Sequence, residues 1–122
     1  MGWHPVNLAL RFGLEMVMLA AYVLWGLQRL EGAAGYALGI GLALGASLLW
    51  GLFRVPGDQS SKGGAPVPVP GVVRLALELV LFAGAVLVLL DAGYETAGVA
   101  LAIVTLLHYL ASYDRVAWLL QR

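Results

Sequence analysis

Residues 11–15 read RFGLE and residues 74–78 read RLALE, so one short motif occurs twice in the chain. Each copy places an arginine and a glutamate four residues apart, near the start of a long apolar run. On a helix this spacing puts both side chains on one face, one turn apart. A charge inside a helix surrounded by lipid is costly and needs a partner. The two copies therefore predict membrane helices whose charged residues meet between them.

The composition favours lipid over water as the surroundings of this chain. Hydrophobic residues make up 61% of the 122 residues and charged residues 11%, whereas soluble domains average about 45–50% and about 25%. A soluble chain of this length could not bury so much apolar surface, so lipid is the expected solvent. Seven basic residues balance seven acidic ones, and the net charge gives no indication of nucleic-acid binding. The sequence contains no cysteine, which excludes disulfides and thiol chemistry.

Four apolar runs, separated by turn residues, are long enough to cross a bilayer. We expect helices over residues 7–27, 33–53, 72–90 and 96–113, and an amphipathic tail after them. The four runs belong to one integral membrane domain, residues 1–122. Asn7 is the expected N-cap of the first helix. In the second run Gly39 and Gly45 are expected at helix–helix contacts, because small residues let helices approach closely in lipid.

The segment 54–71 is rich in proline, glycine and serine and divides the four runs into two pairs. Its second half alternates proline and valine, which favours an extended, polyproline-like chain. We expect it outside the membrane, on the cytoplasmic side, as a linker or as a lid or partner-binding segment. Since each pair of runs begins with the same arginine–glutamate motif, the predicted fold class is all-α. It is a bundle of four transmembrane helices built from two pseudo-repeated helical hairpins.

The basic residues predict the orientation of this bundle. The end that carries both termini and the loop has six of them: Arg11, Arg54, Lys62, Arg74, Arg115 and Arg122. The opposite end has one basic residue and three acids: Arg29, Glu31, Asp91 and Glu95. The positive-inside rule therefore places both termini in the cytoplasm, in a multi-pass membrane protein.

Polar residues of all four helices fall at matching depth near that cytoplasmic end. Glu15 lies about 12 Å along its helix and Glu78 at a similar depth, while His108 and Ser47 lie about 10 Å from the ends of theirs. We expect the arginines and acids of the two motifs to meet in one interior site, each acid within reach of an arginine. The candidate site residues are Arg11, Glu15, Arg74, Glu78, His108, Trp50, Arg54, Tyr22 and Tyr109.

Three functions are compatible with such a site. We favour binding or transport of a small ligand or ion, with the acids facing cations, the arginines facing anions and His108 titrating near neutral pH. Alternatively, the protein is structural or accessory, and its arginine–glutamate pairs only lock the bundle or help it dock a partner. The third alternative is a membrane enzyme acting on a lipid-borne substrate.

The sequence shows no nucleophile–base pair, phosphate-binding loop or metal-spaced motif. It therefore predicts no catalytic residue, no metal site and no cofactor, and an enzyme is the least favoured of the three. The expected partners are the lipid bilayer, a small ligand or ion, and a second copy or another membrane protein. No nucleic-acid partner is expected.

Five stretches together carry a resemblance to a known family. They are residues 7–15 (NLALRFGLE), residues 50–53 (WGLF) followed by Pro56, residues 74–78 (RLALE), His108-Tyr109 and Tyr113-Asp114-Arg115. In these stretches the chain resembles the YrdB-like family of small bacterial membrane proteins. The resemblance covers essentially the whole chain and implies a four-helix protein of the bacterial inner membrane. The family is a domain of unknown function, so the resemblance supplies no catalytic residues.

Overall fold

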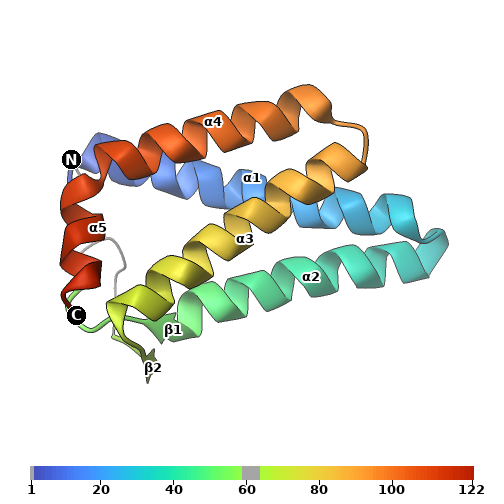
Figure 1. The fold of residues 1–122 in the computed structure, drawn as a ribbon. Coiled ribbons are helices and arrows are strands. Elements are labelled where there is room, and N and C mark those ends of the chain that lie inside the picture. Colours follow the sequence, from blue (N-terminus) through green and yellow to red (C-terminus); the bar gives the residue numbers. More distant parts are fainter. Residues whose placement is uncertain (1, 59–63) are drawn as a thin grey trace.

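The computed structural model describes residues 2–58 and 64–122, and its fold is helical apart from one pair of two-residue strands (Figure 1). The helices are α1 (Pro5–Arg29), α2 (Gly32–Leu52), α3 (Gly71–Asp91), α4 (Glu95–Ala111) and α5 (Tyr113–Leu120). The first four lie close to the expected ranges, and α5 forms most of the expected amphipathic tail. Lys62, which was counted among the cytoplasmic basic residues, lies outside the described part of the chain.

Helix α1 begins earlier than the sequence predicted. The side chain of His4 caps it, because His4 Nδ1 accepts a hydrogen bond from the backbone N–H of Val6 at 3.2 Å. Pro5 suits the first turn of the helix, because a backbone N–H at this position would have no partner within the helix. The prediction that Asn7 is the N-cap is therefore wrong: Asn7 lies inside the helix, with a buried side chain.

The connection between the two hairpins contains the strand pair. Strands β1 (Phe53–Arg54) and β2 (Val67–Pro68) pair in parallel, and the Val69 N–H donates to the Arg54 carbonyl at 3.0 Å. The proline–valine stretch is thus extended at β2, as its composition predicts. Figure 1 shows the strands at the end of the bundle that also carries both chain termini.

Helices α1 and α2 pack backbone against backbone, and glycines make this possible. A Cβ added at Gly39 would lie 2.5 Å from the Val23 carbonyl oxygen, and one added at Gly26 would overlap the backbone of Gly39. Gly45 has nothing within 4 Å of such a Cβ. The expectation for Gly39 is therefore confirmed, and the expectation that Gly45 lies at a contact within the chain is wrong, because Gly45 is on a different face of α2.

This difference predicts opposite effects for two leucine substitutions. Gly39→Leu should lower the free energy of unfolding by about 1–3 kcal/mol, because overpacking forces the two backbones apart. Gly45→Leu should leave stability unchanged or slightly raised, since leucine favours a helix more than glycine does. Unfolding in detergent, followed by circular dichroism, measures both. Equal losses for the two variants would contradict the packing of α2 on α1.

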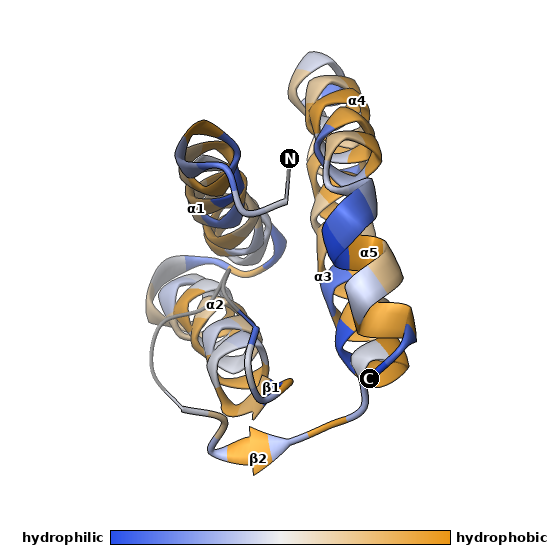
Figure 2. Cartoon of the chain, turned by 90° about the vertical axis from the view of Figure 1, so that its left-hand side faces the viewer, coloured by the Kyte–Doolittle hydropathy of each residue, from blue (hydrophilic) through white to orange (hydrophobic). Residues whose placement is uncertain are grey.

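Hydrophobic residues recur along all of the helices (Figure 2), and they form both an interior core and much of the outer surface. Among the residues described, the buried core consists of Leu14, Met18, Ala21, Ala46, Leu81, Phe82, Ala85, Leu89 and Leu101. Large aliphatic side chains also cover the outside: Val80 is 67% exposed and Leu87 65%. A surface this apolar is typical of proteins that lipid surrounds.

Three helices are long and apolar enough to cross a membrane, namely α1, α2 and α3. Helix α4 passes the same test only together with α5, which turns from it by 71°. Only 17% of the apolar stretch of α2 is buried within the chain. The chain thus has three helices that meet the criteria for a membrane span, or four if α4 and α5 form one broken span.

Helix α5 crosses the end of the bundle where the chain termini lie (Figure 1). It rests directly on the start of α3, since a Cβ at Gly71 would overlap the carbonyl group of Leu119. The Gly2 N–H donates to Asp114 Oδ1 at 2.7 Å and ties the N-terminus to the same helix. This docking turns Arg115 of α5 toward the interior, where it is 2% exposed.

Candidate functional site

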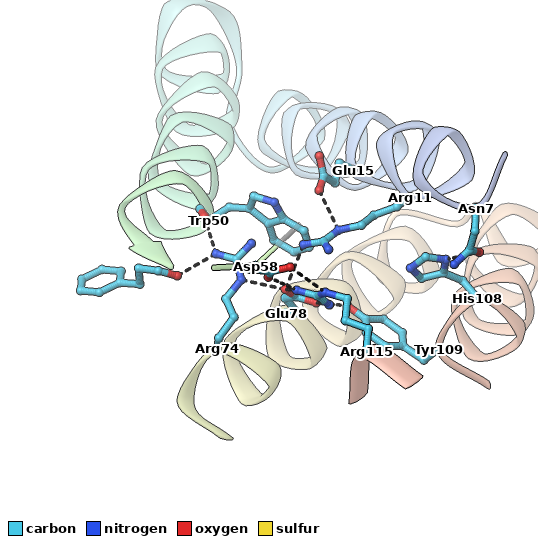
Figure 3. A network of polar contacts seen from close by, with 11 residues as sticks. Asn7, Arg11, Glu15, Trp50, Asp58, Arg74, Glu78, His108, Tyr109 and Arg115 are labelled. Carbon is cyan, nitrogen blue, oxygen red and sulfur yellow. Dashed lines mark hydrogen bonds and ion pairs between the residues drawn. The ribbon is translucent and has the colours of Figure 1, made fainter. Parts of the chain in front are cut away.

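Glu78 of α3 is the centre of a buried polar cluster at this end of the bundle (Figure 3). Its side chain is fully buried and accepts five hydrogen bonds from the described residues. Three come to Oε2, from Arg74 at 2.7 Å, Arg115 at 2.8 Å and Arg11 at 3.0 Å. Two come to Oε1, from Tyr109 at 2.6 Å and again from Arg115 at 2.9 Å. One carboxylate therefore binds groups from α1, α3, α4 and α5.

The structure brings the four motif residues together, but not symmetrically. Arg11 bonds Glu15 in its own helix at 3.3 Å and Glu78 across the bundle at 3.0 Å. Arg74 bonds Glu78 alone among the acids. Each acid of the two motifs is within salt-bridge distance of Arg11, whereas Arg74, in the described chain, forms no ion pair with the acid of the other motif. Glu78 lies in the centre of the cluster and Glu15 at its edge.

Trp50 of α2 contacts two of the cluster's arginines. The guanidinium carbon of Arg74 lies 4.7 Å from the centroid of the Trp50 ring, and that of Arg11 lies 5.1 Å from it. Arg74 Nη1 also donates to the backbone carbonyls of Trp50 and, at 2.7 Å, of Phe53. These carbonyls at the end of α2 lack partners within the helix, and an arginine satisfies them. Trp50, one of the predicted site residues, therefore contacts the cluster through its ring and its backbone carbonyl.

Two members of the cluster were missed by the sequence analysis as site residues. Arg115 binds Glu78 through two nitrogens and on its other edge binds Asp58, from Nη2 at 2.7 Å and from Nε at 3.3 Å. Asp58 comes from the segment between α2 and α3, and its side chain is 2% exposed. Arg115 continues the polar stripe Thr105, His108 and Ser112 at helical spacing, which was a usable signal. Asp58 carries no periodic signal, because it lies in irregular chain.

A second polar group lies beside the cluster, where α1, α4 and α5 meet. Asn7 donates to the Ser112 hydroxyl at 2.7 Å, and its carbonyl oxygen lies 3.0 Å from His108 Nδ1. The His108 ring packs edge to face on Tyr109, which links the two groups. His108 was expected among the acids, but its ring nitrogen pairs with Asn7 instead. A buried asparagine that satisfies a histidine and a serine is a packing device.

Two of the predicted site residues lie apart from the cluster. Tyr22 donates to the Leu81 carbonyl at 2.6 Å and ties α1 to α3 deeper in the bundle. It shares a helix face with Glu15 but lies two turns farther along, so a common face did not imply a common site. Arg54 bonds the Gly64 carbonyl at 3.3 Å, within the connecting segment. Neither side chain contacts Glu78. Ser47, expected at the same depth, bonds the Ala43 carbonyl of its own helix.

Glu15 lines a cleft of about 190 Å³ between α1 and α2. Ser47 and Trp50 line it from α2, and Met16, Met18 and Leu19 supply apolar walls from α1. The side chain of Glu15 is 20% exposed, whereas that of Glu78 is fully buried. In the described part of the chain its one ion pair is with Arg11, at 3.3 Å, and Arg11 also binds Glu78. Glu15 is therefore the cluster's least saturated acid and the one that a small molecule can reach.

The formal charges of the cluster cancel. Its cations are Arg11, Arg74 and Arg115, and its anions are Glu15, Glu78 and Asp58. For Arg115, on the short helix α5, burial alone would lower the pKa, but the hydrogen bonds and charges of Glu78 and Asp58 outweigh it and raise the pKa above its ordinary value. Within residues 2–58 and 64–122, no group of three or more histidines or acids is placed to hold a metal ion.

The comparisons with known proteins identify relatives but no activity. Residues 9–106 match the family described as "Protein of unknown function (DUF2568)". The chain is 34% identical over 119 residues to the "Uncharacterized protein YrdB" of Bacillus subtilis (strain 168), and the match covers 98% of this chain and 97% of that protein. No solved structure matches the chain significantly.

Proposed function

The chain belongs to the DUF2568 family of proteins of unknown function, and we propose that it is an integral membrane protein that binds a small ligand at Glu15. In this proposal α1 to α4 cross the bacterial inner membrane as a four-helix bundle. One end of the bundle carries both termini, α5 and the β1–β2 pair, and this end faces the cytoplasm. The charge cluster then lies in the cytoplasmic half of the bundle, where both arginine–glutamate motifs begin their helices.

The charges at the two ends of the bundle support this orientation. Figure 1 shows α5, β1, the C-terminus and the starts of α1 and α3 at the end with the termini, and these elements carry Arg115, Arg54, Arg122 and the two motif arginines. The other end of the bundle carries Arg29 as its single basic residue, and Arg29 forms an ion pair with Asp91. A basic excess near the ends of the spans is typical of the cytoplasmic side.

Cysteine labelling tests the orientation, because the natural chain contains no cysteine. Pro56 and Glu95 are both exposed and lie at opposite ends of the bundle. We expect a membrane-impermeant maleimide to label Glu95→Cys on intact cells and to label Pro56→Cys only after the cells are opened. The reverse pattern would show that the orientation is wrong.

The cleft beside Glu15 is the observation that supports a binding function. A carboxylate inside an apolar bundle normally has partners that saturate it, and Glu78 shows how fully this chain can do so. Among the described residues Glu15 forms an ion pair with Arg11 alone, at 3.3 Å, and it lines an accessible cleft. A ligand with an N–H or O–H group would complete the coordination of Glu15 and place its apolar part against Trp50 and the methionines.

The cleft also limits the size of the ligand. Its volume of about 190 Å³ lies below the range of about 300–1,000 Å³ that is typical of ligand pockets. Small primary amines and short-chain alcohols or amino alcohols have this size and carry the required donor. An ammonium group would gain a charge-assisted hydrogen bond to the carboxylate.

Thermal unfolding in detergent, measured against a panel of such amines and alcohols, tests this function. We expect at least one compound to raise the melting temperature of the wild type and not that of Glu15→Gln, which keeps the shape but loses the charge. Glu31→Gln is the matched control, because Glu31 is exposed at the far end of the bundle. Equal responses of the wild type and Glu15→Gln to every compound would contradict ligand binding at Glu15.

A second candidate function is structural, and the balance of charges in the cluster favours it. Each of the three acids and three arginines has at least one ion-pair partner within the cluster. Such a group fixes helix register and holds α5 in place without any ligand. Under this alternative Glu15 would serve only as a partner of Arg11, and the ligand panel would not distinguish Glu15→Gln from the wild type.

A further inference from the structure

Arg115 is held between two carboxylates that differ in origin. Glu78 belongs to the rigid helix α3, whereas Asp58 belongs to the irregular chain that follows β1. We propose that the edge of Arg115 facing Asp58 is a binding site for an oxyanion, which the chain's own Asp58 carboxylate occupies in this structure. The proposal concerns Arg115 and Asp58, which do not line the Glu15 cleft, and it does not depend on that cleft.

The geometry at Asp58 is that of anion recognition by arginine. Nη2 and Nε of Arg115 donate to the two oxygens of Asp58, at 2.7 Å and 3.3 Å. A planar guanidinium edge binds a carboxylate or a phosphate in this two-pronged manner. The other edge of Arg115 binds Glu78 and fixes the plane of the group. The donor pair would therefore stay in position if Asp58 left.

The charge of the cluster requires an anion at that position. Without Asp58, three guanidinium groups would face the two carboxylates of Glu15 and Glu78, and the buried cluster would carry a net positive charge. A buried uncompensated charge is strongly destabilising. A monovalent oxyanion in place of the Asp58 carboxylate restores neutrality, so exchange of one for the other conserves the charge of the cluster.

The cluster also holds one unused donor. Arg74 is fully buried, and its Nη2 has no hydrogen-bond partner in the described part of the chain. A carboxylate has two oxygens, and Arg115 already engages both oxygens of Asp58. A phosphate group brings additional oxygen atoms, which gives it more acceptors for the same cluster than Asp58 can offer.

The contacts of the chain that leads to Asp58 indicate what its release would uncover. The Asp58 N–H donates to the Val55 carbonyl at 3.2 Å, the side chain of Val55 is buried, and Gly57 lies near the Trp118 ring. Pro56 and Gly57 are exposed. Release of Asp58 would therefore uncover Val55, and this provides a way to observe the exchange.

The ligand class that fits is a phosphate-bearing anion, either free in solution or as the head group of an anionic lipid. Both carry the oxygens that an arginine edge recognises. Arg115 belongs to α5, which crosses this end of the bundle (Figure 1). The proposed orientation places this end at the cytoplasmic membrane surface.

Cysteine reactivity at Val55 tests the exchange. Val55→Cys would be the single cysteine of the chain, and its labelling rate by a soluble maleimide reports how often this residue is uncovered. We expect inorganic phosphate to raise that rate several-fold over sodium chloride at equal ionic strength. Pro56→Cys, which is exposed already, should label at the same rate in both salts. Equal rates for Val55→Cys in phosphate and in chloride, with no effect of lipid either, would overturn the proposal.

A lipid arm separates the two sources of the anion. Phosphatidylglycerol added to neutral detergent micelles, in chloride without phosphate, should raise the rate if a lipid head group is the ligand. An increase with phosphate alone would identify a free oxyanion.

A pair of variants tests the site without a cysteine. Asp58→Asn removes the internal anion, so phosphate should raise its melting temperature by several degrees more than it raises that of the wild type. Asp114→Asn removes an acid from the same helix as Arg115 but outside the cluster, and should respond as the wild type does. An equal response of Asp58→Asn and Asp114→Asn to phosphate would also overturn the proposal.

Discussion

Replacing Glu78 by glutamine should lower the free energy of unfolding by about 3–5 kcal/mol, the usual cost of leaving buried charges without their partner. Glutamine keeps the shape of the side chain but leaves three arginines opposite two acids. Glu78 accepts five hydrogen bonds from the described residues, shared between its two carboxylate oxygens. A glutamine side chain keeps only one of these oxygens. Denaturation in mixed micelles of increasing dodecyl sulfate content measures the loss.

Glu15→Gln is the matched control for this prediction. Glu15 carries the same charge in the equivalent motif position, but it is partly exposed and holds one arginine that Glu78 also binds. Its loss should cost clearly less than that of Glu78, because Arg11 keeps Glu78 as a partner when Glu15 is neutralised. If the two variants lost the same stability, Glu78 would not be the centre of the cluster.

Gly71→Leu should have the second largest effect, at the upper end of the range of about 1–3 kcal/mol that overpacking causes, or beyond it. A side chain at this position would overlap the backbone of Leu119, so α5 could no longer rest on α3. Because α5 carries Arg115, its displacement would also withdraw Arg115 from Glu78 and Asp58.

Gly13→Leu controls for the change from glycine to leucine. A Cβ at Gly13 has nothing within 4 Å, and the residue lies in the middle of α1. This variant should unfold at the wild-type midpoint or above it. A wild-type midpoint for Gly71→Leu as well would show that α5 does not depend on close contact with α3.

The apolar runs and the repeated motif predict most of the fold that places the site. Long apolar runs have few structural alternatives, so the ranges of α1 to α4 follow from them. The convergence of Arg11, Arg74 and Glu78 follows from helical spacing and from the cost of leaving charges unpaired in lipid. Trp50 and Tyr109 were predicted only as the lining of an aromatic pocket, so their contacts with the arginines and with Glu78 do not follow from the sequence.

The remaining features depend on tertiary contacts that spacing does not encode. Asn7 looks like a helix cap because it stands at the start of an apolar run, yet His4 caps α1 and Asn7 bonds α4 and α5 residues. Asp58 lies in irregular chain, where no helical periodicity indicates which way a side chain points. The bend at Ser112, which turns Arg115 inward, has no proline or glycine to signal it.

The glycines of α2 show a similar limit. Gly35 and Gly39 share the spacing of Gly41 and Gly45, and composition does not tell which pair meets a neighbour. The structure selects Gly35 and Gly39, because their face contacts the backbone of α1 at Gly26 and Val23. Only the position of the neighbouring helix distinguishes the two faces.

A double-mutant cycle between Glu78 and Arg115 tests most directly whether one buried network joins α5 to the bundle. Glu78→Gln, Arg115→Gln and the double variant would be unfolded under identical detergent conditions. If the two residues are partners, the double variant should lose less than the sum of the single losses by at least about 1 kcal/mol, within the range seen for contacting residues. Losses that add to within about 0.5 kcal/mol, as for independent sites, would contradict the network.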